Sequence, residues 1–197
     1  MLSYKDSLKI LKETNALIDG HFILSSGLHS SQYVQCAKLL SKPFKAEKFC
    51  SSLAEKISKE FSEIDLILSP AVGGIVIGFE IGRLLKKETI FSERVNGVFN
   101  LRRGFQILKN TKVLIVEDVI TTGKSSLECS ELIKSANATL LGFACLIDRS
   151  NGESLLNEKI ISQIEVNIPI YKENELPENL KSIAITKPGS RDLKWAK

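Results

Sequence analysis

The chain has 197 residues, of which 43% are hydrophobic and 25% charged, and its net charge is +4 at pH 7. These proportions exclude an intrinsically disordered chain, which would have fewer apolar residues and more net charge. The length suits one compact domain, so we expect residues 1–197 to fold as a single unit. Basic residues are spread along the sequence, and we expect no nucleic-acid partner.

The cysteine pattern and the apolar runs indicate neither a metal framework nor a membrane segment. The four cysteines form no C-x-x-C pair, and there are only two histidines. Free thiols are typical of a reducing compartment. The N-terminus carries charges where a signal peptide needs an apolar run, and the longest uncharged apolar stretch, residues 66–79, is too short to span a bilayer. We therefore expect a cytoplasmic protein with no membrane partner.

The N-terminal third predicts two helices separated by two short strands. Ser3 and Asp6 resemble a capping box, and the first helix is expected to end at Asp19-Gly20. Residues 21–24 and 32–36 are predicted as strands around a Ser/Gly turn. After Pro43, apolar residues keep helical spacing as far as residue 61 and predict the second helix.

From residue 65 onward the pattern alternates between strands and helices. Strands are predicted at 65–69, 89–91, 112–116, 140–147 and 164–170, and helices at 73–85 and 125–136. Such alternation predicts an α/β fold with a central, mainly parallel twisted sheet flanked by helices. Ligands of these sheets bind beyond the carboxyl ends of the strands, so the chemistry is expected in the loops that follow them.

The segment after strand 112–116 combines an acid pair with an anion-binding pattern. Glu117 and Asp118 are followed by a run rich in Thr and Ser around Gly123, which opens a helix. Backbone N–H groups at a helix start suit a phosphate, and glycine allows its close approach. Carboxylates instead suit sugar hydroxyls, a bound Mg²⁺ or a carbocation-like centre. The order therefore predicts a ribose phosphate, with its 5-phosphate on residues 121–125 and its hydroxyls on the acids.

Three other interpretations of this segment are weaker. A capped helix beside two surface acids would not explain why strand, acid pair and anion cradle occur in this order. A Walker A loop requires a glycine where Asp118 stands. The G-x-G-x-x-G fingerprint of dinucleotide-binding folds is absent.

The segment VLIVEDVITTGKSS resembles the donor-binding signature of the type I phosphoribosyltransferase family. The resemblance covers nearly the whole chain and is greatest to the branch that uses orotate. It rests also on segment 20–29 with Tyr33, on Arg94 with segment 101–105, and on segments 147–149 and 187–191. The fold implied is that of the family, with a small hood to which residues 1–42 contribute and which holds the base.

The resemblance implies transfer of ribose 5-phosphate from 5-phosphoribosyl 1-pyrophosphate to orotate. Arg94, Glu117 and Asp118 would act in catalysis, and Thr121 and Arg149 would bind orotate. The implied donor-binding residues are Arg94, Glu117, Asp118, Val119, Ile120, Thr121, Thr122, Gly123, Lys124 and Ser125. Mg²⁺ would arrive with the donor without direct protein ligands, and the implied assembly is a homodimer. A planar guanidinium such as that of Arg149 binds a carboxylate through two parallel charge-assisted bonds.

Several residues keep a plain structural alternative. Arg149 could form a local ion pair with Asp148, although neighbours on a strand point to opposite faces. Segment 69–74 resembles the family's pyrophosphate loop, but glycines recur every four residues from Gly74 and could only allow close helix packing. His21 and His29 are expected to stabilise a turn rather than to act in catalysis.

The middle loop of the family corresponds to residues 94–104, with Arg94, Arg102 and Arg103. Well-studied members carry lysines and a histidine there, and many have a lysine where Ser25 stands; this chain has neither. Two other functions stay open at this point. One is transfer to a different base, which would not need Arg149, and the other is a regulator that senses the donor without catalysis.

Overall fold

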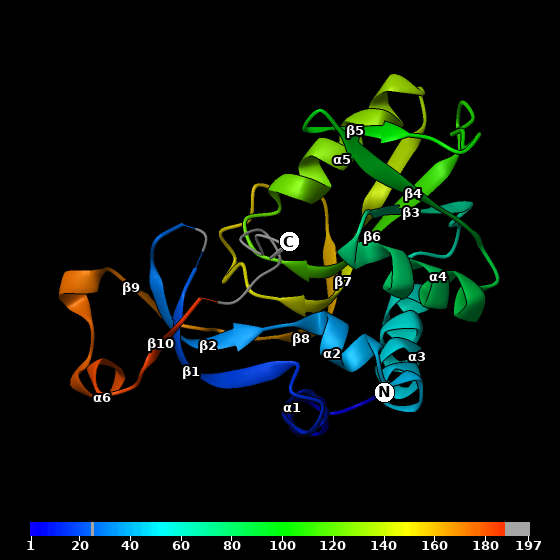
Figure 1. The fold of residues 1–197 in the computed structure, drawn as a ribbon. Helices are drawn as coiled ribbons and strands as arrows, with labels where there is room; N and C mark the ends of the chain where they lie inside the picture. The colour runs from blue at the N-terminus through cyan, green and yellow to red at the C-terminus, as the bar shows by residue number, and fades with distance from the viewer. Residues whose placement is uncertain (25, 188–197) are drawn as a thin grey trace, which may run out of the picture.

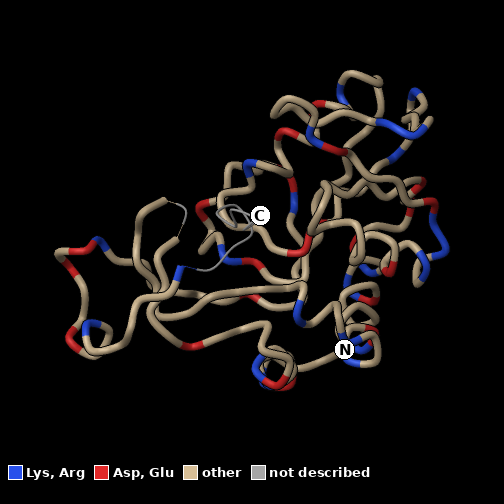
Figure 2. Tube along the Cα trace, in the orientation of Figure 1, with Lys and Arg blue, Asp and Glu red and all other residues tan. Residues whose placement is uncertain are grey.

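The structure is a computed structural model that describes residues 1–24 and 26–187 (Figure 1). Ser25, and the segment 187–191 apart from Lys187, therefore lie outside the described residues. The described chain forms a large six-stranded sheet and a smaller four-stranded sheet beside it. Basic and acidic residues are interspersed over both parts (Figure 2).

The large sheet has the strand order β5-β4-β3-β6-β7-β8. Its strands are β3 Leu66–Pro70, β4 Glu88–Val95, β5 Val98–Leu101, β6 Lys112–Ile120, β7 Thr139–Asp148 and β8 Ile160–Glu165. Every pair of neighbours is parallel except β4 and β5, which form an antiparallel hairpin. The predicted mainly parallel sheet is confirmed.

Helices cover both faces of this sheet. The described helices are α1 Tyr4–Glu13, α2 Cys36–Leu40, α3 Pro43–Glu60, α4 Gly73–Leu85, α5 Lys124–Ser135 and α6 Glu178–Lys181, with a 3-10 turn at Glu173–Glu175. Along β6 the apolar side chains alternate between two cores. Leu114 and Val116 pack in the core with α3 and α4, whereas Val113 and Ile115 pack in the core with α5. Burial on both faces explains why the sequence of this strand is an unbroken apolar run.

The small sheet combines the two ends of the described chain in the order β10-β1-β2-β9 (Figure 1). Its strands are β1 Leu17–Ile23, β2 His29–Val34, β9 Ile170–Tyr171 and β10 Ile185–Thr186. His21 and His29 are buried, with Nε2 of one 2.7 Å from Nδ1 of the other, and His21 Nδ1 lies 3.3 Å from the carbonyl of Ile183. The two imidazoles therefore tie the hairpin to the segment that precedes β10.

Six predicted elements differ from the structure by more than one residue at an end. The strands predicted at 21–24 and 32–36 are two of them, because they form β1, Leu17–Ile23, and β2, His29–Val34. The first helix ends at Glu13, because the Thr14 hydroxyl caps the carbonyl of Ile10 and Asn15 adopts a positive φ of 56°. Asp19 and Gly20 lie within β1 instead. The predicted strand 164–170 is divided between β8 and β9, which belong to different sheets.

The other two errors concern strands that are longer than predicted. Strand 89–91 extends to Val95, so Arg94 lies on β4 and not in a loop. The Asn96-Gly97 turn, with φ of 51° and 85°, turns the chain directly into β5. Strand 112–116 continues to Ile120, so Glu117 and Asp118 belong to β6.

Candidate functional site

The acid pair lies near the carboxyl end of β6, at the centre of the large sheet. Glu117 is buried, with 8% of its surface exposed, and its Oε2 accepts from the Asp118 amide at 3.3 Å. Asp118 Oδ1 accepts from the Val119 amide at 2.9 Å. Successive strand residues face opposite sides of the sheet, so one acid approaches α5 and the other approaches α4.

Burial changes the protonation of both acids in the free protein. It raises the pKa of Glu117 to about 8, with a further increase from the charge on Asp118 and a smaller decrease from Arg94. Burial also raises the pKa of Asp118. The free protein therefore resists two negative charges here, and a ligand that brings positive charge or hydroxyl donors would favour the ionised pair.

We expect the free protein to become less stable as pH rises from about 5 to about 9. The pKa of Glu117 in the folded state, about 8, lies above its ordinary value of 4.5. Protonated Glu117 therefore stabilises the folded protein fully at pH values below its ordinary pKa of 4.5. This stabilisation is lost as the pH rises through the folded-state pKa of about 8. Melting temperatures across this range should fall more steeply for the wild type than for Glu117→Gln. Parallel profiles for the two proteins would contradict this origin of the pH dependence.

The predicted anion cradle forms the turn between β6 and α5. Thr121, Thr122, Lys124 and Ser125 are exposed, and Thr122 Oγ1 accepts weakly from the Lys124 amide at 3.4 Å. Gly123 has a φ of 76°, and a Cβ there would lie 2.6 Å from Leu156. Only glycine suits this position, and the first amides of α5 have no partner within their own helix. The turn thus offers backbone donors and hydroxyls just beyond the acid pair.

The predicted pyrophosphate loop lies against the acid pair from the other side. A Cβ on Gly73 would lie 2.8 Å from both carboxylate oxygens of Asp118. The later glycines are required for packing, because a Cβ on Gly78 would lie 2.0 Å from Ser69 Oγ and one on Gly82 would lie 1.9 Å from Thr89 Oγ1. Close packing of α4 on the sheet explains Gly78 and Gly82, whereas the absence of a side chain at Gly73 leaves room for the Asp118 carboxylate.

Gly73→Ala is expected to weaken donor binding by about 10- to 100-fold while the melting temperature changes little. Its added methyl group would force the Asp118 carboxylate to move, but the φ of Gly73 lies outside the region that excludes side chains. Donor KM and thermal unfolding, measured on the same preparation, would check both parts. Unchanged kinetics would show that this close approach has no functional role.

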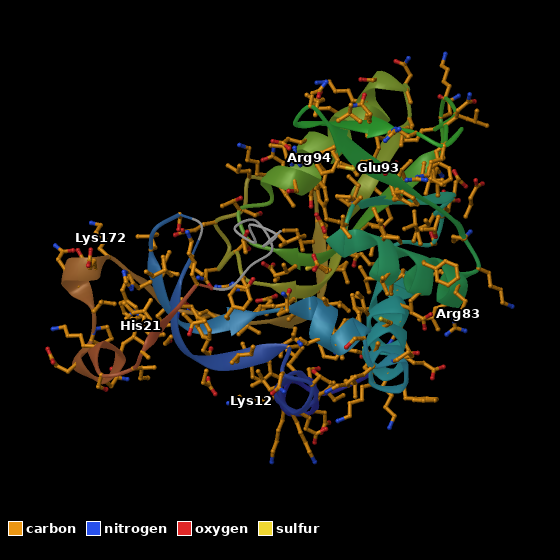
Figure 3. The ribbon with its side chains drawn as sticks, viewed as in Figure 1. Lys12, His21, Arg83, Glu93, Arg94 and Lys172 are labelled. Atoms are coloured by element: carbon orange, nitrogen blue, oxygen red, sulfur yellow. The ribbon has the colours of Figure 1, made fainter. Side chains whose placement is uncertain are left out.

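Of the three middle-loop arginines, Arg94 is the one whose charge affects the acid pair, because it lowers the pKa of Glu117. It lies on β4, and Figure 3 shows it beside α5. Arg103 instead pairs with Glu93 at 2.9 Å and lies over the ring of Phe91. Arg102 is exposed beyond β5.

Arg149 follows β7 and faces the small sheet. Its backbone amide donates to the carbonyl of Ile120 at 2.8 Å, while its Nε is buried without a hydrogen-bond partner. Asp148 accepts from the Ser150 amide at 2.7 Å, and no ion pair joins it to Arg149 among the described residues. Burial lowers the pKa of Arg149, and Tyr33 of β2 and Cys36 of α2 oppose this change. A half-buried guanidinium whose Nε is an unused donor suits an anionic ligand.

The register of β6 and β7 places Thr121 beside Arg149. Ile120 of β6 pairs with Asp148 of β7, so Thr121 and Arg149 are the residues that follow the two paired ends. The phosphate cradle and the half-buried guanidinium of Arg149 therefore lie at adjacent strand ends. The geometry joins an anion site, an acid pair and a second anion site along one edge of the sheet.

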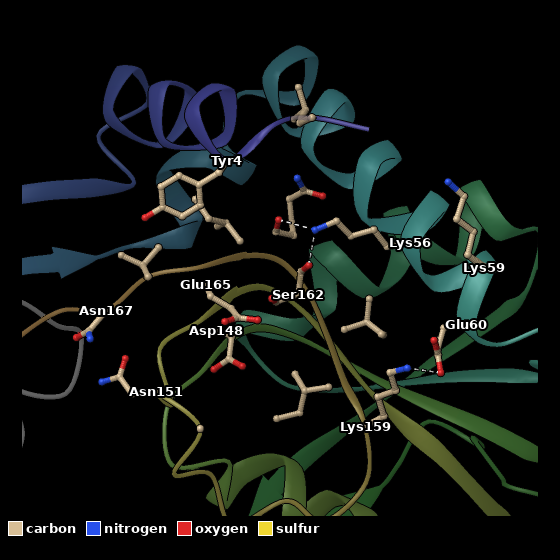
Figure 4. A pocket seen from close by; sticks show the side chains of 17 residues that line it. Tyr4, Lys56, Lys59, Glu60, Asp148, Asn151, Lys159, Ser162, Glu165 and Asn167 are labelled. Atoms are coloured by element: carbon tan, nitrogen blue, oxygen red, sulfur yellow. Dashed lines mark hydrogen bonds and ion pairs between the residues drawn. The ribbon is translucent and has the colours of Figure 1, made fainter.

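A large open groove lies elsewhere. It has a volume of about 1000 Å³ and runs along the edge strand β8, between α1 and α3 (Figure 4). Lys56 Nζ donates to the carbonyls of Ser162 and Gln163 there, both at 2.9 Å, which protects the exposed strand edge. Neither Glu117 nor Arg149 lines this groove.

Two further observations limit the kind of site. In the described part of the chain, no helix is both long and apolar enough to cross a membrane. Within the same residues, no cluster of three or more His, Cys, Asp or Glu side chains could hold a metal ion. A cation at the acid pair would therefore need further ligands from a bound molecule.

Comparison with known proteins identifies what this arrangement resembles. The phosphoribosyl transferase domain family matches residues 42–179. The orotate phosphoribosyltransferase of Erythrobacter litoralis is 45% identical over 188 residues, or 95% of this chain and 97% of that protein. The crystal structure of orotate phosphoribosyltransferase from Aeropyrum pernix has a TM-score of 0.68 and 25% identity, covering 80% of this chain and 92% of that one. Adenine phosphoribosyltransferase from Saccharomyces cerevisiae shares the fold, with a TM-score of 0.66 and 19% identity over 80% of this chain and 99% of that one.

Proposed function

Because this chain belongs to the phosphoribosyltransferase family, we propose that it transfers ribose 5-phosphate from 5-phosphoribosyl 1-pyrophosphate to orotate. The products are orotidine 5-monophosphate and pyrophosphate, and the reaction belongs to pyrimidine nucleotide synthesis. The observation that carries the choice of orotate is Arg149, whose buried Nε has no partner among the described residues. Orotate is a base with a carboxylate, which a guanidinium binds through paired bonds.

The donor would bind along the carboxyl ends of β6 and β3. Its 5-phosphate would accept from the first amides of α5 and from the Thr and Ser hydroxyls of residues 121–125. Its ribose hydroxyls would donate to Glu117 and Asp118, whose carboxylates can each accept several bonds. Its pyrophosphate would lie between Gly73 and Arg94, on either side of the acid pair.

At C1 of the ribose the reaction forms one bond and breaks one, and the attacking ring nitrogen also loses its proton, which passes to solvent water or to the departing pyrophosphate. The ring nitrogen of orotate supplies an electron pair to C1 of the ribose, and the bond from C1 to pyrophosphate breaks with its pair leaving on oxygen. Positive charge develops at C1, so the ionised acids stabilise the transition state more than the ground state. Arg94 would stabilise the negative charge that develops on the leaving group. No covalent intermediate with the protein is required.

Mg²⁺ is proposed to accompany the donor. The two carboxylates fit such a cation, because Mg²⁺ prefers oxygen ligands and usually binds through one or two carboxylates together with phosphate oxygens. When bound, it would neutralise part of the charge on the pyrophosphate. Glu117 and Asp118 would hold the ribose hydroxyls, and the donor would supply most of the oxygen ligands of the cation.

The base would lie between the strand ends of the large sheet and the hood. Tyr33 and Cys36, which belong to β2 and α2, both influence Arg149 and so border the same place. We propose that residues 1–42 contribute this side of the pocket, as the family resemblance implies. Thr121 would contact the base from the end of β6.

We also propose a homodimer in the cytoplasm. Val72, which caps the start of α4, and Val76 and Phe79 within α4 follow helical spacing. They are 83%, 53% and 66% exposed, which is unusual for three large apolar side chains on one face of a monomer. The molecular mass in solution would report this assembly. All four cysteines are free and buried, as suits a reducing compartment.

Transfer to another base is the second candidate, since the adenine enzyme of yeast shares this fold and the fold alone does not choose the base. Incubation of the purified protein with Mg²⁺, donor and one base at a time would decide between them. Loss of orotate absorbance, with no turnover of adenine, hypoxanthine or uracil, is the expected result. Turnover of a different base would remove the role of Arg149, and donor binding without any turnover would favour a regulator.

A further inference from the structure

Resting on the proposed function, we propose that Glu128 is a positioning residue that fixes Arg94 for the departing pyrophosphate. Glu128 is on α5, one helical turn after the phosphate cradle, and Arg94 is on β4. The two side chains form an ion pair in which Arg94 Nη2 donates to Glu128 Oε2 at 2.5 Å. This contact joins the hairpin to the helix that would hold the 5-phosphate.

Three contacts hold the Arg94 guanidinium from different directions. Besides the ion pair, Nη1 donates to the carbonyl of Gly97 at 2.6 Å, and the guanidinium carbon lies 4.0 Å from the centre of the Phe99 ring. Phe99 is itself buried and provides a fixed platform. An arginine side chain has several rotatable bonds, so three contacts remove much of its freedom before any ligand binds.

The fixed position is useful because it lies on the face of the sheet that α5 covers, which is also the face that Glu117 approaches. Ser92, two residues before Arg94 on β4, has its Oγ 3.2 Å from Cys129 Sγ of α5. The charge of Arg94 lowers the pKa of both Glu117 and Cys129, the neighbour of Glu128 on α5. A guanidinium has five N–H donors, and the two hydrogen bonds in this structure leave others for phosphate oxygens. A cation that is already in place stabilises charge on the leaving group without reorganisation during the reaction.

The proposed role also explains why an acid is tolerated so close to the phosphate cradle. An isolated carboxylate one turn from a phosphate cradle would repel the donor. Here its charge is shared between Arg94 and Lys124, whose Nζ lies 4.0 Å from Oε1. If Glu128 instead acted as a latch that withholds Arg94 from the donor, removal of Glu128 would strengthen the binding of pyrophosphate.

A double-mutant cycle separates these roles. Glu128→Ala is expected to weaken the binding of inorganic pyrophosphate with Mg²⁺, measured by calorimetry, by about tenfold. In the Arg94→Ala background the same change should have almost no further effect, because Glu128 acts through Arg94. Kinetically, donor KM should rise or kcat fall, while orotate KM stays unchanged. Glu128→Gln, which keeps the shape and one hydrogen-bond acceptor, should lie between the wild type and Glu128→Ala.

The matched control is Glu131→Gln on the same helix, which also loses one ion pair, that with Lys134 at 3.8 Å. It should bind pyrophosphate like the wild type. An equal loss from Glu128→Ala with and without Arg94, an equal loss in the control, or tighter binding would each overturn the proposal. Tighter binding would identify a latch instead.

The experiment also separates this proposal from the proposed function. If the wild type consumes orotate but the cycle is additive, only the positioning role fails. If the cycle shows coupling but no orotate is consumed, only the choice of base fails, since pyrophosphate binding requires no base.

Discussion

Asp118→Asn is expected to lower kcat by about 100- to 1000-fold, the usual cost of one lost electrostatic contact to a transition state. Asparagine keeps the size of the side chain and an acceptor for the Val119 amide, which now lies 2.9 Å from Oδ1. What it loses is the negative charge beside C1 of the ribose. Steady-state kinetics with donor and orotate would measure the change.

Thermal unfolding separates this loss from damage to the fold. The charge on Asp118 helps to raise the pKa of Glu117, so neutralising it relieves repulsion in the free protein. The melting temperature of Asp118→Asn should therefore be equal to or above that of the wild type. Full retention of kcat and donor KM would contradict the role of the acid pair.

Asp65→Asn is the matched control for the acid pair. Asp65 also accepts from a backbone amide, that of Lys112 at 2.8 Å, but it lies at the opposite end of the sheet. The control should lose some stability and keep kcat. A similar loss of kcat in both variants would indicate a general effect of charge.

Arg149→Met is the second change with a large expected effect, and it should raise orotate KM by about 10- to 100-fold, as expected for a lost hydrogen bond to a charged group. Donor KM should change much less, because Arg149 lies beyond the cradle at the end of β7. Arg149→Lys keeps the charge but not the planar fork, so it should recover only part of the binding.

The same substitution should stabilise the free protein. The Nε of Arg149 is buried without a partner, so its removal relieves a desolvation cost that only a ligand would offset. The matched control is Arg83→Met on α4, because Arg83 is paired with Glu80 at 2.7 Å and should gain nothing. Loss of stability in Arg149→Met, with orotate KM unchanged, would show that the arginine has a structural role.

The central part of the fold could be predicted from sequence because its patterns are strong and local. Helix α4 begins and ends at the predicted residues, since its start follows a buried strand and its end precedes a polar turn. The sequence predicts the acid pair and the cradle together because they are contiguous. Their register with Arg149 followed from the rule that parallel strands end at one edge.

The remaining features depend on contacts that leave no local pattern. Strands β9 and β10 have two residues each, and pairing with β1 and β2 alone defines them. The position of Arg94 on β4 does have a local signal, because Asn96-Gly97 is typical of a tight hairpin turn and places Arg94 on the strand before it. Glu128 had no such signal, because a single acid on an amphipathic helix is ordinary until the fold places Arg94 beside it.

The most direct test of this account compares the binding of two nucleotides that differ by one carboxylate. Orotidine 5-monophosphate and uridine 5-monophosphate share the phosphate, the ribose and the pyrimidine ring, and calorimetry would give the affinity of each. We expect the wild type to bind the orotidine nucleotide about 10- to 100-fold more tightly, and Arg149→Met to bind the two alike. Equal affinities in the wild type would contradict the assignment of orotate, even if the phosphate cradle binds both.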